Sequence, residues 1–323
     1  MIKKIQILSI LTFLACNIVA QASDSITFKK NLDEVSVNAL RANDKTPMAF
    51  TNISKSEIKK SNLGQDLTYL ISLTPSVVTT SDAGAGIGYT GLRIRGTDPS
   101  RINVTINGIP VNDSESQGVW WVNMPDFASS LDNIQIQRGV GTSTNGAAAF
   151  GASINLKTLA LNKKAYTITN NSVGSFNTLK NNIEFGSGML NNKFTFDGRL
   201  SRISSDGYID RATSDLKSLY LQGAYFGKKS VLKAIVFSGQ ERTYQAWNGV
   251  PKKYLDTNRT FNSYTYENEV DNYNQTNYQL HYNEQLNSKT NIHLATHYTH
   301  GEGYFESEKL NQNLADYGLN NIL

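Results

Sequence analysis

The sequence predicts a small α+β domain followed by antiparallel strands of an incomplete, all-β transmembrane barrel. Three observations support this prediction. Residues 46–160 mix helical spacing with short alternating strands, the chain from residue 164 onward has only strand patterns, and the connections between these later strands differ regularly in length. Short and long connections in alternation are typical of outer-membrane barrels, whose turns on one side of the membrane are short and whose loops on the other are long.

Composition excludes several other classes of protein. The 323 residues include 31 Lys and Arg against 27 Asp and Glu, so only 18% of the chain is charged and the net charge is +4. No run after the first twenty residues approaches the ~20 apolar residues of a membrane-spanning helix. The 16 Tyr and 13 Phe are too many for a disordered chain. The small net charge argues against a nucleic-acid partner.

The first 22 residues are predicted to be a signal peptide. Two lysines precede an apolar run over residues 5–19, and residues 20–22 have the small-x-small form of a signal peptidase site. Cleavage after Ala22 would remove Cys16, the only cysteine, so we expect a mature chain without disulfides. The alternative is a lipoprotein cleavage box ending at Cys16, for which Phe13 is a poor first residue.

Residues 23–45 are polar and predict a flexible segment, and residues 46–160 predict the α+β domain. In this domain a helix start with a possible cap is expected at Ser54. A helix is expected over 63–73, where four apolar residues have helical spacing, and Pro75 ends it. Strands are expected over 91–96, 102–106 and 134–138. Asn107-Gly108 follows the second of these and predicts a hairpin turn.

The part from 163 to 323 predicts seven strands that are long enough to cross a bilayer, since a tilted strand needs ~9–11 residues. Short connections are expected at 187–192, 227–230 and 287–289, and long ones at 205–215, 244–274 and from 301; only the short connection at 174–177 departs from the alternation. The expected strands are 165–173, 178–186, 193–204, 216–226, 231–243, 275–286 and 290–300.

The two faces of these strands differ in polarity. Pairing residue 286 with 290 places Tyr278 opposite Tyr298 and Tyr282 opposite Leu294 on a face that would contact lipid. Polar residues such as Asn277 alternate with them and would face water or a polar filling. A soluble sandwich has the same alternation, but the signal peptide, the missing cysteines and the unequal loops favour a barrel. Seven strands do not close, so we expect a fragment, or a barrel whose remaining strands are encoded elsewhere.

Five segments of the chain carry ordered motifs: residues 32–39, 92–96, 104–110, 136–139 and 141–155. The first segment resembles the TonB box of TonB-dependent outer-membrane receptors, and the other four are similar to parts of that family's plug domain. The resemblance implies that the α+β domain is a plug inside a 22-stranded barrel, most of which this chain lacks. It also implies a location in the outer membrane of a Gram-negative bacterium, amid outer-membrane lipid.

The TonB box is the expected binding site for TonB and its inner-membrane energising complex. An extended segment near the mature N-terminus can add as a strand to a partner's sheet edge; the alternative is an ordinary disordered leader. The predicted TonB-binding residues are Leu32, Asp33, Glu34, Val35, Ser36, Val37, Asn38 and Ala39.

Arg95 and Arg138 both precede glycine at strand ends. The resemblance implies that they lock the plug to the barrel by pairing with barrel glutamates, a role that suits the planar, two-pronged guanidinium. Their partners are expected in strands that this chain lacks. The alternative is a solvated charge at the end of a strand.

Two loops are expected to contact ligand at the outer apex of the plug. Residues 81–89 are rich in glycine and include Asp82 and Tyr89; residues 112–123 include Asp113, Glu115 and the adjacent Trp120 and Trp121. Indole rings in a loop offer a stacking surface for a ligand. The alternative is that one of the two tryptophans packs in the core or against the barrel wall.

No catalytic function is predicted. The glycines from 139 to 146 lack the spacing of a dinucleotide-binding motif. His281, His293 and His297 could contact a metal in the lumen, but polar lining is the favoured interpretation, so we expect no cofactor and no resident metal. The leading hypothesis is energised uptake of a scarce nutrient, a ferric siderophore or another iron complex. The alternative is a passive adhesin or structural β-protein of the outer membrane.

Overall fold

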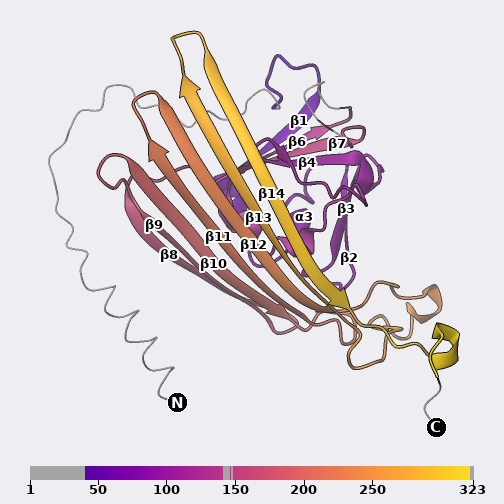
Figure 1. Ribbon diagram of the computed structural model, residues 1–323. Coiled ribbons are helices and arrows are strands. Elements are labelled where there is room, and N and C mark those ends of the chain that lie inside the picture. Colours follow the sequence, from indigo (N-terminus) through magenta and orange to yellow (C-terminus); the bar gives the residue numbers. More distant parts are fainter. Residues whose placement is uncertain (1–40, 141–145, 147, 321–323) are drawn as a thin grey trace, which may run out of the picture. The chain divides into compact units, whose positions relative to one another are not determined.

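The computed structural model describes residues 41–140, 146 and 148–320 (Figure 1). The predicted signal peptide and TonB box, residues 32–39, lie outside the described residues. The strands form a five-stranded sheet with the order β1-β6-β7-β4-β5, a two-stranded sheet of β2 (Val77–Ser81) and β3 (Thr90–Ile94), and a seven-stranded sheet from β8 to β14 in sequence order. The predicted fold class, an α+β domain followed by antiparallel strands of an unclosed barrel, is therefore confirmed.

The five-stranded sheet is the centre of the plug domain. Its strands are β1 (Ala49–Ser54), β4 (Ile102–Ile106), β5 (Ile109–Pro110), β6 (Leu131–Arg138) and β7 (Ala152–Thr158). The predicted turn joins β4 to β5, and Asn107 and Gly108 both have positive φ, as a type I′ hairpin requires. Ile106, Ile134 and Ile154 are fully buried, so the core of the plug lies against this sheet.

Two short helices accompany the sheet. Ser54 begins α2 (Lys55–Ser61) with a capping box, in which its hydroxyl accepts the Glu57 N–H and the Glu57 side chain accepts the Ser54 N–H. The helix expected over 63–73 is only α3 (Leu67–Leu70). That prediction was too long, because Gly64 has a φ of +131° and Leu63 lies 60% exposed outside the helix.

The seven-stranded sheet, called the wall below, confirms the expected strand number and order. Its strands are β8 (Ala165–Gly174), β9 (Thr178–Ser187), β10 (Phe194–Ser205), β11 (Ser214–Phe226), β12 (Ser230–Tyr244), β13 (Val270–Gln285) and β14 (Asn291–Phe305). The register places Tyr278 opposite Tyr298 and Tyr282 opposite Leu294, as predicted. β13 begins five residues before the predicted start, so the long loop before it is shorter than expected. In the described residues, no helix is long and apolar enough to cross a membrane.

The outward face of the wall has an apolar band between a charged and an aromatic end. Leu221 of β11 and Leu280 of β13 project outward from the inner part of their strands, and Leu232 of β12 projects outward nearer the short turns; the three are 39–44% exposed. Towards the long loops, Arg202 pairs with Asp215 on this face. Towards the short turns, Phe194 packs on Tyr225 with ring centres 5.2 Å apart. This order of residues fits a sheet that meets lipid across its middle.

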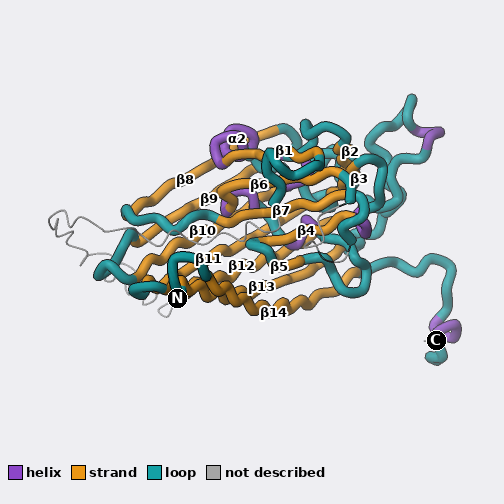
Figure 2. The backbone as a smooth tube through the Cα atoms, turned by 90° about the horizontal axis from the view of Figure 1, so that it is seen from above, coloured by secondary structure: helices purple, strands orange, loops and turns teal. Residues whose placement is uncertain are grey.

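The plug domain packs on the inward face of the wall. Figures 1 and 2 show the five-stranded sheet on one side of the seven strands. Tyr220, Ile235 and Phe237 of the wall belong to the same buried cluster as the plug core. The segment from η3 (Trp121–Asn123) to η4 (Phe127–Ser130) lies between plug and wall. Contact between the two parts is therefore partly apolar.

Candidate ligand-binding site

A cavity of about 920 Å³ lies where two plug loops meet strands β12, β13 and β14. The first loop joins β2 (Val77–Ser81) to β3 (Thr90–Ile94), and the second runs from Pro110 to Met124. The wall contributes the inward residues of its strands near the long loops, together with Trp247. Both plug loops that were expected to contact ligand thus line one pocket.

Glycines and a carboxylate shape these two loops. In the first loop Gly84, Gly86 and Gly88 all have positive φ, and a Cβ on Gly88 would lie 2.7 Å from the Ser214 hydroxyl oxygen of the wall. Glycine therefore lets this loop turn sharply and approach β11 closely. In the second loop the Asp113 carboxylate accepts the backbone N–H groups of Ser116 and Glu115, at 2.6 and 3.0 Å. These hydrogen bonds lower the pKa of Asp113, so its carboxyl group is ionised.

Tyr89 links the plug to the wall inside the pocket. Its ring meets Trp120 and Trp247 edge to face, with ring centres 6.1 and 5.5 Å away. Its hydroxyl donates to the Asp271 carboxylate and lies 3.4 Å from an oxygen of Glu241. Burial and the neighbouring carboxylates raise the pKa of the Tyr89 phenol, so it remains a hydrogen-bond donor. Burial also raises the pKa of Asp82, to about 6.

Five of the six residues predicted to contact ligand lie together. Asp82, Tyr89, Asp113, Glu115 and Trp120 all line the pocket. Trp121 does not: it is 6% exposed and packs in the core of the plug. Trp121 thus follows the alternative interpretation, in which one tryptophan packs in the core, and contact of Trp120 with a ligand stays a prediction. Trp120 precedes η3 as its N-cap residue, whereas Trp121 is the first residue of that helix.

The wall residues of the pocket were not predicted. Glu241, Asp271, Tyr273 and Trp247 line it. Three of these fall within the region from 244 to 274, which was expected to be a loop. Asp271 and Tyr273 lie four and two residues before Gln275, so their side chains point inward like that of Gln275, and this was a signal that could have identified them.

The predicted lock arginines contact the plug itself. Arg138 donates to the Thr51 hydroxyl at 3.2 Å and to the Pro75 carbonyl oxygen at 3.4 Å. Arg95 is exposed and has a φ of +53°. In the part of the chain that the structure describes, neither arginine pairs with a carboxylate, so their role as a lock stays a prediction.

A different, buried charge cluster joins plug and wall, and the sequence did not reveal it. Asp126 of the plug is 3% exposed and has left-handed backbone geometry. Its carboxylate accepts from Lys180 of β9 at 2.6 Å and lies 3.2 Å from the Arg199 guanidinium of β10. Asn182 and Ser201 of the same two strands donate to it at 2.7 Å each. Burial alone would raise the pKa of Asp126, but Arg199 and Lys180 outweigh it and hold this pKa below its ordinary value.

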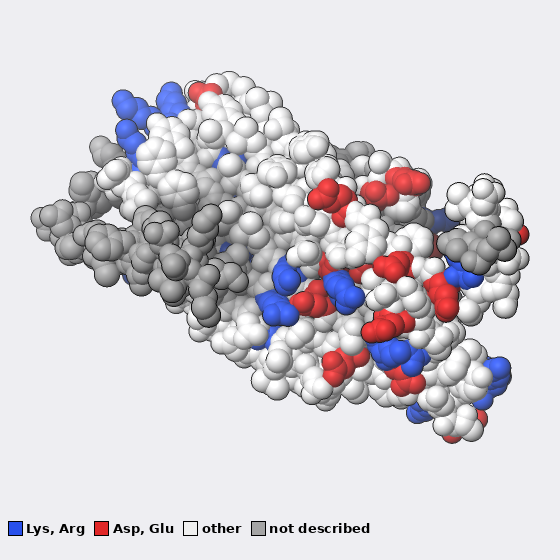
Figure 3. Space-filling model, turned by 60° about the horizontal axis from the view of Figure 1, so that its bottom comes forward, with Lys and Arg blue, Asp and Glu red and all other residues white. Residues whose placement is uncertain are grey.

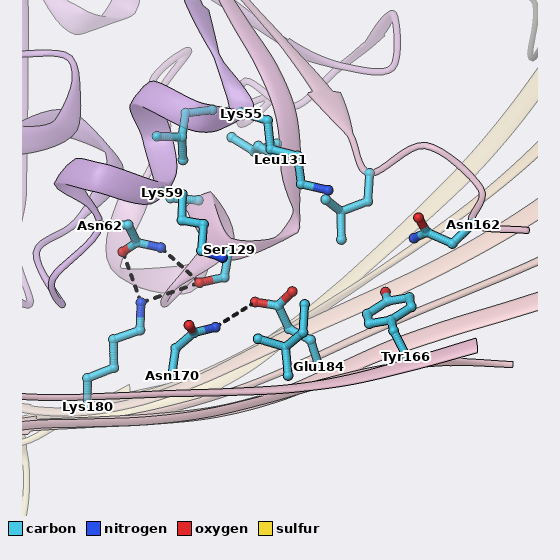
Figure 4. A pocket seen from close by; sticks show the side chains of 14 residues that line it. Lys55, Lys59, Asn62, Ser129, Leu131, Asn162, Tyr166, Asn170, Lys180 and Glu184 are labelled. Atoms are coloured by element: carbon cyan, nitrogen blue, oxygen red, sulfur yellow. Dashed lines mark hydrogen bonds between the residues drawn. The ribbon is translucent and has the colours of Figure 1, made fainter. Parts of the chain in front are cut away.

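Next to this cluster lies a small cavity of about 180 Å³ between α2, β8 and β9 (Figure 4). Lys180 reaches into it and donates to Asn62 of the plug at 3.0 Å, while Asn170 donates to Glu184 on the neighbouring strand. Lys180 also lies 3.3 Å from the Ser129 hydroxyl oxygen, so side chains of plug and wall bind each other at this cavity. It is therefore part of the contact between plug and wall.

A globular domain packed on the inward face of antiparallel, outward-apolar strands is the architecture of a plugged outer-membrane barrel. Residues 42–153 match the family model described as the TonB-dependent receptor plug domain. With the strands that follow, the chain has the plug and first barrel strands of a TonB-dependent outer-membrane receptor. This family resides in the outer membrane of Gram-negative bacteria, which is the location of this chain.

The chain is also similar to individual receptors. It is 28% identical over 157 residues to the vitamin B12 transporter BtuB of Vibrio vulnificus (strain YJ016), a match that covers 48% of this chain and 25% of that protein. Two solved structures share its fold. The ferric-catecholate import receptor Fiu from E. coli K12 has a TM-score of 0.66 at 16% identity, with 80% of this chain and 39% of that chain covered. The ferric citrate transporter FecA has a TM-score of 0.65 at 20% identity, with 82% and 42% covered. The chain thus spans less than half of each relative.

Proposed function

We propose that the chain belongs to a receptor that captures a scarce metal-containing nutrient and imports it with energy from TonB. A ferric siderophore or another iron complex is the leading candidate for the nutrient, and a cobalamin-like complex is the second. The observation that carries this proposal is the pocket itself, which plug loops and wall strands line together. A ligand bound there contacts both parts, so its presence can bias the plug between two arrangements.

The proposed import step uses the predicted TonB box. TonB would pair with residues 32–39 as an added strand. Force applied to this segment would then displace part of the plug and open a path along the polar inward face of the wall. The residues proposed for ligand contact are Asp82, Tyr89, Asp113, Glu115 and Trp120, and the homologous receptors named above are transporters or import receptors rather than enzymes.

Deleting residues 32–39 from the receptor tests this proposal. Ligand binding to cells should remain, because the deletion does not touch the pocket, whereas uptake of the radiolabelled nutrient should be abolished. A matched deletion of residues 23–30 removes the same length of the polar segment and should leave both binding and uptake intact. Undiminished uptake without residues 32–39 would exclude the mechanism.

A further inference from the structure

Among the described residues, the pocket is lined by several carboxyl groups and by no strongly basic side chain. Neither Lys nor Arg occurs among the described residues that line it, and His297 is the one titratable base there. Figure 3 shows the loop end of the molecule, where acidic side chains are spread over the centre of the view with basic ones among them; none of the basic ones lines the pocket. The five carboxyl residues are Asp82, Asp113, Glu115, Glu241 and Asp271.

Two of these carboxyl groups share a single donor. Glu241 is 1% exposed, and both it and Asp271 approach the one hydroxyl of Tyr89. Thr243 supplies Glu241 with another hydrogen bond, at 3.1 Å. In the described part of the chain neither carboxyl group forms an ion pair with Lys or Arg. A buried carboxyl group is ordinarily either paired or neutral, and a nearby cation favours its ionised form.

Aromatic rings stand beside these acids. Trp120 is 53% exposed and Trp247 is 38% exposed, and both contact the ring of Tyr89. Indole faces attract cations through their quadrupole and also stack on planar groups. Acids together with indoles therefore favour a ligand that is positively charged, and they disfavour an anion, which would meet like charges from the plug and from the wall.

We propose, building on the uptake function above, that this pocket selects metal complexes of net positive charge and rejects anionic chelates. The specificity comes from carboxylates on both parts, so a cationic complex also bridges the plug loops to β12 and β13. An anionic chelate of the same metal and similar size lacks this bridge.

Equilibrium binding to the purified receptor in detergent micelles tests the charge preference. Three probes suffice: a ferric tris-hydroxamate that carries a free ammonium group and is net positive, ferric citrate, and a ferric tris-catecholate, the last two being net negative. The positive complex should bind about 100-fold more tightly than either negative one at low ionic strength. The difference should shrink as salt is added, because salt screens the exposed charges.

Variants test whether the carboxylates of the pocket cause the preference for the positive complex. A receptor with both Asp82→Asn and Glu115→Gln should bind the positive complex about tenfold more weakly and the negative complexes more tightly. Asp44→Asn removes a carboxylate of the plug that does not line the pocket, and it should change none of the three affinities. Equal affinities in the double variant and the unaltered receptor would overturn the proposal.

The outcomes separate this inference from the proposed function. If a negative complex binds as tightly as the positive one, and its uptake still requires residues 32–39, the charge preference is wrong and the uptake function stands. If none of the three complexes binds, the charge preference and the proposed import of iron complexes both fail.

Discussion

Trp120 and Trp121 are adjacent in the chain and have different surroundings, so they separate binding from folding. Trp120→Ala should weaken ligand binding about tenfold, because it removes an exposed indole of the pocket. Trp121→Ala should instead lower the free energy of unfolding by about 3–5 kcal/mol, because it empties a site in the plug core. Equilibrium binding and chemical unfolding of each purified variant measure the two effects. Comparable losses of binding, with equal stabilities, would contradict these assignments.

Asp126 is the other residue with a large expected effect. Asp126→Asn leaves Lys180 and Arg199 buried without a counter-charge, so the contact between plug and wall should lose about 3–5 kcal/mol. Faster proteolysis of the plug in the folded receptor would report this loss. The matched control is Asp98→Asn, at an exposed ion pair with Arg93, which should change the cleavage rate little. Equal rates for the two variants would show that the buried cluster does not hold the plug.

The pKa of Asp126 also sets the pH range over which the buried charge cluster stabilises the contact between plug and wall. Arg199 and Lys180 hold it below the ordinary value of 3.8, so the native state keeps the carboxylate ionised where an unfolded chain would begin to take up a proton. The stabilisation is therefore complete above pH ~4 and is lost only as the pH falls through the lower native value. The difference between Asp126→Asn and the unaltered receptor should accordingly persist at pH 5 as well as at pH 8.

At the scale of elements, strand β12 shows how closely the wall approaches the plug. A Cβ on Gly239 would collide with the Asn123 carbonyl oxygen and come within 2.6 Å of Cδ of Pro125. Gly239→Ala should therefore push the plug from the wall and cost about 1–3 kcal/mol. Limited proteolysis of the plug should become faster. In Gly174→Ala the new Cβ lies 3.5 Å from the Thr178 Cβ, an ordinary contact, and the rate should not change; a Gly239→Ala receptor that resists protease equally would be inconsistent with this close approach.

Elements with a local signal were predictable, and contacts between distant elements were not. Alternation and turn residues predicted the seven wall strands and the register of Tyr278 with Tyr298, because side-chain direction in a strand follows from parity alone. Helical spacing gave a wrong helix start at Leu63, because Gly64 with its positive φ separates Leu63 from α3. The meeting of Asp126 with Lys180 and Arg199 joins residues 54 and 73 positions apart, and no local pattern encodes such a pairing.

At the scale of the whole molecule, the charges of plug and wall differ between the two places where these parts meet. At the inner contact, Lys180 and Arg199 of the wall surround the Asp126 carboxylate of the plug, so opposite charges attract the plug to the wall. At the pocket, acids from both parts face one cavity without a basic partner among the described residues. Plug and wall therefore attract each other at the inner contact, whereas at the pocket both contribute acidic groups. A cationic ligand would compensate the charge of these acidic groups, which couples occupancy of the pocket to the fit of the plug.

The proposed receptor requires the outward face of the wall to contact lipid, and a substitution of Leu221 tests this requirement. It projects outward from the middle of β11 and is 41% exposed, whereas Lys217 of the same face lies nearer the charged end of the band. Leu221→Lys should cost about 2–4 kcal/mol, because it places a charge near the middle of the bilayer. The amount of folded, heat-modifiable receptor in the outer-membrane fraction should fall. Leu221→Phe keeps the position apolar and should assemble normally; an undiminished yield of the lysine variant would mean that this face does not contact lipid.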